Sequence, residues 1–260
     1  MTARWLTALV GVPLLLGLLI IGGPAWGAFI VVLIILSGLE LGNLYARIGV
    51  PDTTLWMCLG GLFIFFITYT YTRDSHALFP WYVLIGLIIL VALAKEVMSR
   101  QHRPLQRAGA VCLGSLYLGL YAFLYLIRAN GLSLALVAII GTWATDTLAF
   151  FIGRAIGKHP LAPTISPKKT REGAMAGLVG GMSAGACIAF FASWPIWHGF
   201  LFGLGVAIGS QMGDLVESAM KREAGVKDSG SLLPGHGGVL DRFDSLLFAG
   251  ATVYYLQLLL

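Results

Sequence analysis

Segment 213–244 (GDLVESAMKREAGVKDSGSLLPGHGGVLDRFD) contains the densest set of side chains that could take part in chemistry. If the preceding apolar helix continues past Asp214, then Asp214, Ser218 and Lys221 lie on one face, because residues three or four apart are neighbours on a helix. Glu217 belongs to the same face. This pattern brings acidic and basic groups together at one helix end, where they could hold an anionic substrate and a metal ion.

Two further carboxylates, Asp241 and Asp244, stand at the start of the last apolar run, residues 243–260. They share a helix face by the same spacing, and the free amide groups of the helix N-terminus point toward the same end. Carboxylates from two helix ends supply hard oxygen ligands, which hold Mg²⁺ alongside nucleotide phosphates. The sequence therefore predicts a magnesium site where these helix ends meet.

Glycines and cations lie between the two groups of carboxylates. Four glycines between positions 230 and 238 allow the backbone to approach a phosphate closely, and the cations can neutralise a polyphosphate. His236 could bind a phosphate oxygen or protonate a leaving group, and the alternative is a histidine in an exposed turn. The candidate substrate-binding residues of this segment are Ser218, Arg222, Lys227, Asp228, His236, Gly237, Gly238 and Arg242.

A second polar region begins at Asp146, which lies within the apolar run 131–152. An ionisable group at that depth in a membrane indicates function, and the alternative is a structural partner for a buried Arg or Thr. Residues 153–173 (GRAIGKHPLAPTISPKKTREG) follow, with glycines and prolines that exclude a long helix. Topology alone could account for their cations, but not for Ser166 or Glu172. The candidate substrate-binding residues here are Ser166, Lys168, Lys169, Arg171 and Glu172.

Carboxylates, clustered cations and glycines together are typical of a phosphoryl- or nucleotidyl-transfer site. The sequence has no GxxxxGK[ST] motif, so a Walker-type nucleotide site is excluded. It also has no basic arm, zinc finger or aromatic-basic pattern, so we expect no nucleic-acid partner.

The elements that must position these residues are membrane helices. Of the 260 residues, 58% are hydrophobic and only 11% are charged, so lipid must be the solvent for most of the chain. A crossing needs about 20 predominantly apolar residues. We predict an all-α polytopic membrane protein with about nine spans, near residues 5–22, 25–42, 53–71, 80–97, 109–127, 131–152, 173–193, 197–215 and 243–260.

The charge pattern predicts the orientation of these spans. With a cytoplasmic N-terminus, 15 of the 17 Lys and Arg residues fall on the cytoplasmic side, as the positive-inside rule requires. Both polar regions then face the cytoplasm. We divide the chain into an N-terminal transmembrane region, 1–108, and a catalytic transmembrane region, 109–260, with cytoplasmic loops at 153–172 and 214–242.

Residues Ser218–Asp244 (SAMKREAGVKDSGSLLPGHGGVLDRFD) resemble the signature of the CDP-diacylglycerol synthases, also called phosphatidate cytidylyltransferases. The order of Ser, Lys-Arg, Lys-Asp, Pro before His-Gly-Gly, and Asp-Arg-x-Asp is matched without a gap. The stretch from Asp146 through SPKKTREG is similar to the second polar region of that family, so the resemblance covers roughly residues 110–260.

The resemblance implies that CTP and phosphatidic acid (phosphatidate) react to give CDP-diacylglycerol and pyrophosphate, with Mg²⁺, at the cytoplasmic face of a bacterial inner membrane. It also implies a homodimer and metal ligation by Asp214 and Asp241. In our hypothesis Asp244 and Asp146 support this metal site or bind a second cation. The expected catalytic residues are Asp214, Asp241, Lys221 and Asp244, and the expected metal ligands are Asp214, Asp241, Asp244 and Asp146.

Three other functions are compatible with parts of the pattern. A secondary transporter could use Asp146 as an ion site, but its polar residues would extend across the membrane rather than gather at one face. A polyprenol or phytol kinase would also bring a nucleotide to a membrane acceptor, but it would release a nucleoside diphosphate. A scaffold or binding module has no need for so many carboxylates beside cations.

Overall fold

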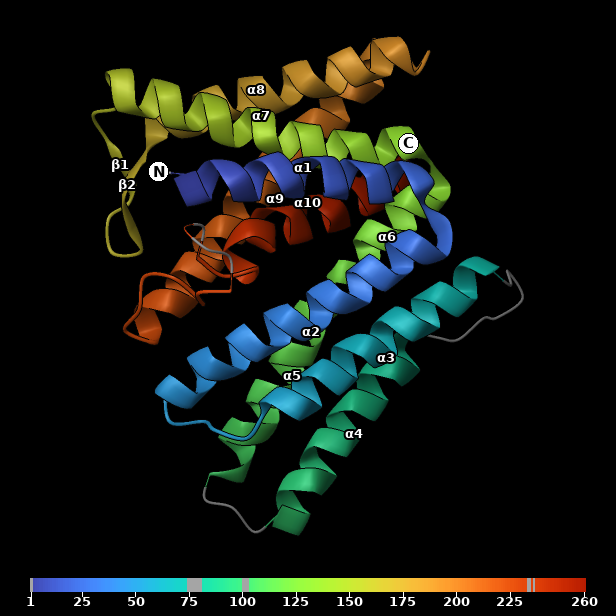
Figure 1. The fold of residues 1–260 in the computed structure, drawn as a ribbon, viewed down its shortest axis with the longest axis vertical. Helices are drawn as coiled ribbons and strands as arrows, with labels where there is room; N and C mark the ends of the chain where they lie inside the picture. Colours follow the sequence, from blue (N-terminus) through green and yellow to red (C-terminus); the bar gives the residue numbers. More distant parts are fainter. Residues whose placement is uncertain (1, 74–80, 100–102, 233–234, 236) are drawn as a thin grey trace. The chain divides into compact units, whose positions relative to one another are not determined.

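The structure is a computed structural model, and it describes residues 2–73, 81–99, 103–232, 235 and 237–260. In this part of the chain, ten helices and one short hairpin follow one another (Figure 1). The helices are α1 (Thr2–Ile21), α2 (Gly23–Arg47), α3 (Thr54–Arg73), α4 (Trp81–Ser99), α5 (Pro104–Gly119), α6 (Tyr121–Asn130), α7 (Leu132–Ile156), α8 (Arg171–Phe191), α9 (Ile196–Glu223) and α10 (Leu240–Leu259). The strands are β1 (Pro160–Ala162) and β2 (Ser166–Thr170).

Each of the nine predicted spans falls on helix, and the fifth is divided between α5 and α6. Among the described residues, six helices are long and apolar enough to cross a membrane: Gly23–Arg47, Thr54–Thr72, Pro104–Asn130, Leu132–Ile156, Arg171–Phe191 and Ile196–Glu223. The predicted class, an all-α polytopic membrane protein, is therefore confirmed. That α1, α4 and α10 also cross the membrane stays a prediction.

The helices carry large apolar side chains on their outer surfaces, as lipid contact requires. Leu55, Phe66 and Leu113 keep 60% or more of their surface exposed. Water would penalise so many exposed apolar groups, whereas hydrocarbon does not. The surface therefore agrees with the membrane assignment made from composition.

The chain forms two compact units. The first comprises Met1–Leu126 and Glu223–Asp241, and the second comprises Ile127–Arg222 and Arg242–Leu260. Most of the segment between α9 and α10 thus packs with the N-terminal helices rather than with the helices that precede and follow it. The functional division at residue 108, which was drawn on other grounds, stays a prediction.

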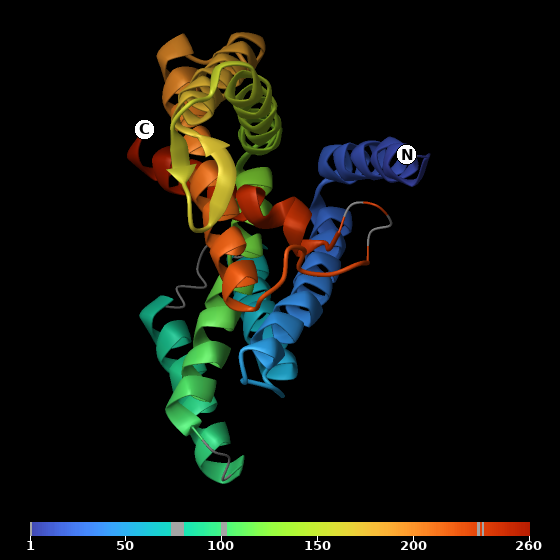
Figure 2. The same ribbon diagram turned by 90° about the vertical axis from the view of Figure 1, so that its left-hand side faces the viewer.

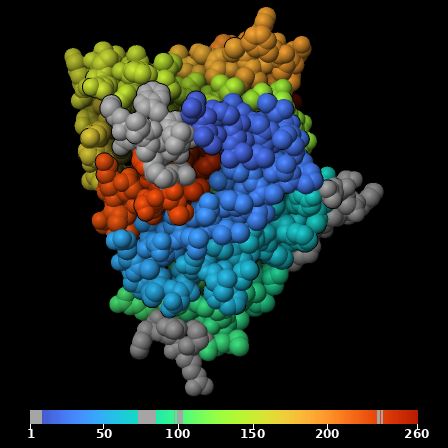
Figure 3. All heavy atoms as spheres, in the orientation of Figure 1, coloured from blue at the N-terminus to red at the C-terminus, as the bar shows by residue number. Residues whose placement is uncertain are grey.

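In the first unit, α3 lies beside α2 (Figures 1 and 3), and it also packs against α5. Small residues allow these close contacts. A Cβ at Gly61 would lie 2.8 Å from the Cβ of Leu118, and one at Gly114 would lie 2.7 Å from Cγ of Met57. Close approach of this kind is the usual basis of helix packing in membranes, where no water drives the helices together.

In the second unit, α7 packs against α8, and α8 packs against α9 through glycines. A Cβ at Gly185 would lie 2.2 Å from the carbonyl oxygen of Gly199, so only glycine fits at that crossing. The antiparallel hairpin of β1 and β2 lies in the segment between α7 and α8 (Figure 2). The sequence predicted a polar loop there, and the paired strands are an addition to that prediction.

Candidate active site

Helix α9 continues to Glu223, which confirms the predicted extension past Asp214. The predicted face forms, because the Ser218 hydroxyl donates a hydrogen bond of 3.2 Å to Oδ1 of Asp214. The other oxygen of Asp214, Oδ2, pairs with Nζ of Lys169 at 2.5 Å. Lys169 comes from β2, so the hairpin delivers a cation to the carboxylate on α9.

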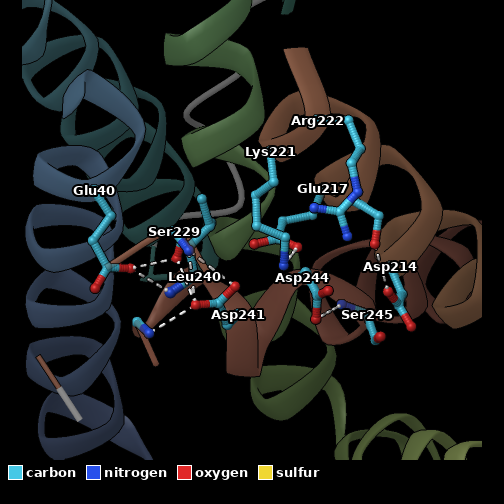
Figure 4. A network of polar contacts seen from close by, with 12 residues as sticks. Glu40, Asp214, Glu217, Lys221, Arg222, Ser229, Leu240, Asp241, Asp244 and Ser245 are labelled. Carbon is cyan, nitrogen blue, oxygen red and sulfur yellow. Dashed lines mark hydrogen bonds and ion pairs between the residues drawn. The ribbon is translucent and has the colours of Figure 1, made fainter. Parts of the chain in front are cut away.

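Two more carboxylates of the second unit lie within electrostatic range of Asp214. They are Asp146 on α7 and Asp244 on α10, and each interacts with the charge of Asp214. Asp244 is buried, and its Oδ1 accepts the backbone N–H of Ser245 at 2.7 Å (Figure 4). Lys169 and Lys221 supply opposing positive charge. We call Asp146, Asp214 and Asp244 the aspartate cluster.

Lys221 is held by an ion pair with Glu217, one turn earlier on α9 (Figure 4). Glu217 is fully buried, with 0% of its surface exposed. The sequence placed Glu217 on the reactive face but gave it no role. Because a buried carboxylate needs a compensating charge, the pair fixes the position of the Lys221 ammonium group.

The first unit contains a different carboxylate, Asp241, in the first turn of α10. Its Oδ2 accepts the N–H and the hydroxyl of Ser229, each at 3.0 Å, and the N–H of Gly238 at 2.7 Å (Figure 4). The predicted metal ligand Asp241 therefore also ties the two ends of the segment before α10 to each other.

Sequence reasoning missed Glu40 on α2. Its Oε1 accepts the N–H of Val239 at 2.9 Å, and its Oε2 accepts the N–H of Leu240 at 2.8 Å (Figure 4). The Ser229 hydroxyl donates to the same Oε2 at 3.2 Å. One signal could have found Glu40: it is an acidic residue in an apolar run, as Asp146 is. We call Glu40, Ser229 and Asp241 the loop anchor.

The hairpin shows where the other predicted residues of the second unit lie. Glu172 accepts the N–H groups of Lys158 and His159 at 3.1 and 3.3 Å, and so joins the start of the hairpin to α8. Nε of Arg222 donates to the carbonyl oxygen of Ile165 at 3.2 Å. Ser166 begins β2, whereas Lys168 and Arg171 are exposed. The structure brings these residues to one hairpin.

The remaining candidates have simpler surroundings. Lys227, Asp228 and Arg242 are exposed. Gly237 has a φ of 81°, a backbone conformation that other residues rarely adopt, and Gly238 is buried. His236 lies outside the described residues.

The carboxylates of this site are the type of oxygen ligand that Mg²⁺ prefers, although they do not form a complete metal-binding cage. Among the residues that the structure describes, no group of three or more His, Cys, Asp or Glu side chains is arranged to hold a metal ion. Mg²⁺ is commonly bound through one or two carboxylates together with water and substrate phosphates, so it needs no such cage. Like charges in mutual range in the aspartate cluster also favour a bound cation.

The second unit of this membrane protein brings carboxylates and lysines together near helix ends, an arrangement typical of membrane enzymes that act on phosphate groups. Comparison with known proteins specifies the class further. The sequence pattern of the cytidylyltransferase family matches residues 2–260. The chain is 36% identical over 253 residues to a phosphatidate cytidylyltransferase of Staphylococcus haemolyticus, with 95% of each chain covered.

Two further relatives carry the same name. A Staphylococcus aureus protein is 37% identical over 258 residues, and a Staphylococcus epidermidis protein is 34% identical over 255 residues, each with 95% of both chains covered. The chain therefore belongs to the cytidylyltransferase family and is an enzyme of that family. The resemblance seen in Ser218–Asp244 is confirmed.

Proposed function

We propose that this enzyme makes CDP-diacylglycerol and pyrophosphate from CTP and phosphatidate. The relatives are named for a cytidylyl transfer to phosphatidate, and the alignment with them covers 95% of the chain. The observation that carries the proposal is the aspartate cluster, with Lys169 and Lys221 in range of its carboxylates. Such a site suits a metal ion, which would offset the negative charge of the carboxylates, and a triphosphate, which would offset the positive charge of the lysines.

The reaction needs little proton transfer. The phosphate of phosphatidate is already anionic near neutral pH, so its oxygen must be oriented rather than deprotonated. That oxygen attacks the α-phosphorus of CTP and forms a new P–O bond. The bond from the α-phosphorus to the bridging oxygen breaks, and pyrophosphate leaves with the electron pair. No covalent enzyme intermediate is required, and catalysis consists of positioning and charge stabilisation.

The residues of the second unit have defined parts in this proposal. Lys221, held by Glu217, stabilises negative charge on the triphosphate and on the departing pyrophosphate. The exposed cations Lys168 and Arg171 of the hairpin region bind the phosphatidate headgroup. One or two of Asp146, Asp214 and Asp244 would hold Mg²⁺ together with water and substrate phosphates. Metal ligation by Asp241, which belongs to the first unit, stays what the family resemblance implies. The ion, when bound, polarises phosphoryl oxygens and offsets the charge that develops on them.

One assay tests the reaction. Purified protein is incubated with phosphatidate and each of the four nucleoside triphosphates in turn, and both the lipid product and pyrophosphate are measured. We expect CDP-diacylglycerol and pyrophosphate in equal amounts with CTP. Release of CDP with a phosphorylated lipid would instead identify a kinase. Exchange of labelled pyrophosphate into CTP without phosphatidate would contradict direct transfer.

We also propose that the protein lies in a bacterial inner membrane as a homodimer, with both polar regions on the cytoplasmic side. The distribution of 15 of the 17 Lys and Arg residues supports the cytoplasmic orientation, and the homodimer is what the family resemblance implies. Cysteines placed one at a time at Lys168 and Lys227 should react with an impermeant maleimide only after the cells are opened. Labelling of intact spheroplasts would show that the orientation is the opposite one. The homodimer is tested separately by measuring the mass of the purified protein in detergent.

A further inference from the structure

Glu40 on α2 is a carboxylate that the reaction proposed above does not use. Only 2% of its surface is exposed, although it lies on an apolar membrane helix. Burying a carboxylate is costly unless hydrogen-bond donors or opposite charges compensate it. Glu40 is compensated by three donors, and all three come from the segment between α9 and α10 or from the first residue of α10.

The donors show what Glu40 does for α10. The first N–H groups of a helix have no partner within the helix, and they attract anions. Glu40 accepts the N–H groups of Val239 and Leu240, and Asp241 accepts that of Gly238. The sequence predicted only that the free amides of this helix N-terminus point toward the end where Asp241 and Asp244 lie. In the structure two protein carboxylates occupy them, so phosphate contacts must come from other groups.

The glycines before α10 have a related explanation. A Cβ at Gly230 would lie 2.5 Å from Oε1 of Glu40, and one at Gly238 would lie 2.4 Å from Oε2. Both glycines therefore give room to the carboxylate of Glu40. Close approach to a phosphate, which the sequence suggested for this group of glycines, is not needed to account for these two.

We propose that Glu40 is a positioning residue for the transfer reaction: its carboxylate holds Ser229 and residues 238–240 in the conformation that fixes Asp241. The role rests on the function proposed above. Ser229 links the parts, because its hydroxyl donates to Oε2 of Glu40 and to Oδ2 of Asp241, at 3.2 and 3.0 Å. A shift of Glu40 would therefore move the partner that Asp241 also uses.

The substitution Glu40→Gln tests this directly. Both carboxylate oxygens accept a backbone N–H, one from Val239 and one from Leu240. Glutamine keeps the shape but has one oxygen and one NH₂ group. Whichever way its amide is turned, it must face one of these N–H donors with another donor, so at least one hydrogen bond is lost.

Ser37→Ala is the matched control. Ser37 is buried on the same helix, α2, and its hydroxyl forms a hydrogen bond of 2.6 Å with the Tyr121 hydroxyl. Its loss removes a buried hydrogen bond from α2 without touching residues 229–240. Both variants are made in the full chain, and two quantities are measured: steady-state kinetics with CTP and phosphatidate, and amide hydrogen exchange of peptides that cover residues 229–241.

For Glu40→Gln we expect kcat to fall at least about tenfold, since small misplacements at a reacting centre are costly. Exchange at residues 229–240 should rise at least about tenfold, while peptides of α3 and α5 remain unchanged. For Ser37→Ala we expect kcat within about twofold of the original and no change in exchange at 229–240. If Glu40→Gln does not fold, Glu40→Asp replaces it, with changes of at least about threefold in both readouts.

Two results would overturn the proposal. A folded Glu40→Gln protein with unchanged kcat would show a purely structural carboxylate, and unchanged exchange at 229–240 would show that Glu40 does not hold the segment. The exchange arm is independent of turnover. If the original protein forms no CDP-diacylglycerol, the proposed reaction fails, while the exchange result still decides whether Glu40 holds Ser229 and residues 238–240.

Discussion

The loop anchor and the aspartate cluster use the same side-chain chemistry in opposite ways. In the loop anchor, Glu40 and Asp241 accept N–H and O–H groups of the protein itself. In the aspartate cluster, carboxylates lie in range of one another and of two lysines. A carboxylate supplied with backbone donors fixes the chain, whereas carboxylates that repel each other need a cation from outside. The comparison assigns the hold on the segment before α10 to the loop anchor and the binding of a cation to the aspartate cluster, while metal ligation by Asp241 stays a prediction.

The strongest test of this comparison is Asp214→Asn in the aspartate cluster. The change removes charge from the carboxylate that pairs with Lys169 and interacts with Asp146 and Asp244. We expect kcat/KM to fall about a thousandfold, or about 4 kcal/mol of transition-state stabilisation. CTP-dependent lipid product is measured, with the exposed Asp52→Asn as the control. A loss below about tenfold would contradict a place for Asp214 among the reacting groups.

Lys221→Met should reduce kcat about a hundredfold, because a positive charge beside the transferred phosphate is lost. It should also lower the free energy of unfolding by roughly 3–5 kcal/mol, since the buried Glu217 loses its ion-pair partner. Chemical denaturation measures the second effect. Adding Glu217→Gln should restore much of the stability but not the activity. Recovery of activity in the double variant would contradict the proposed contact between Lys221 and substrate.

Gly238→Ala tests the loop anchor from the other side. The added Cβ would lie 2.4 Å from both Oε2 of Glu40 and the Ser229 hydroxyl. We expect about a tenfold loss of kcat and faster hydrogen exchange at residues 229–240, because the hydrogen bonds of Glu40 must rearrange. Gly109→Ala is the matched control, since nothing lies within 4 Å of its added Cβ. Equal kcat values for the two variants would show that the loop anchor has no part in positioning the reacting groups.

The smallest effect is expected for Glu172→Gln. Oε2 of Glu172 accepts the N–H groups of Lys158 and His159, just before the hairpin, and its Oε1 contacts Nδ1 of His159. Glu172 therefore belongs with Glu40 among the carboxylates that hold a neighbouring segment. We expect KM for phosphatidate to rise about threefold with kcat unchanged, because the hairpin cations lose some order. Initial rates at varied phosphatidate measure this. A hundredfold loss of kcat would instead support direct substrate binding, as the sequence pattern suggested.

Part of the arrangement of the candidate site could be predicted because it depends on local patterns. The three- and four-residue spacing on α9 brought Asp214 to Ser218, and both are found in contact. Asp146 was found because a charge in an apolar run is unusual. Glu40 has that same signal, but its partners lie 189 to 200 residues away in the chain, and no local pattern connects them. The pairing of Lys169 with Asp214 was likewise hidden, because it depends on a hairpin register.

The sequence by itself determined that this is a helical membrane enzyme of the cytidylyltransferase family. Apolar runs of membrane length leave lipid as the only suitable solvent, and the signature between Ser218 and Asp244 is specific. Only the tertiary structure decided which carboxylates accept hydrogen bonds from the segment before α10, as in the loop anchor, and which lie near other charged side chains, as in the aspartate cluster. That choice depends on which donors the packed helices bring within about 3 Å of each oxygen, and helix periodicity alone does not specify it.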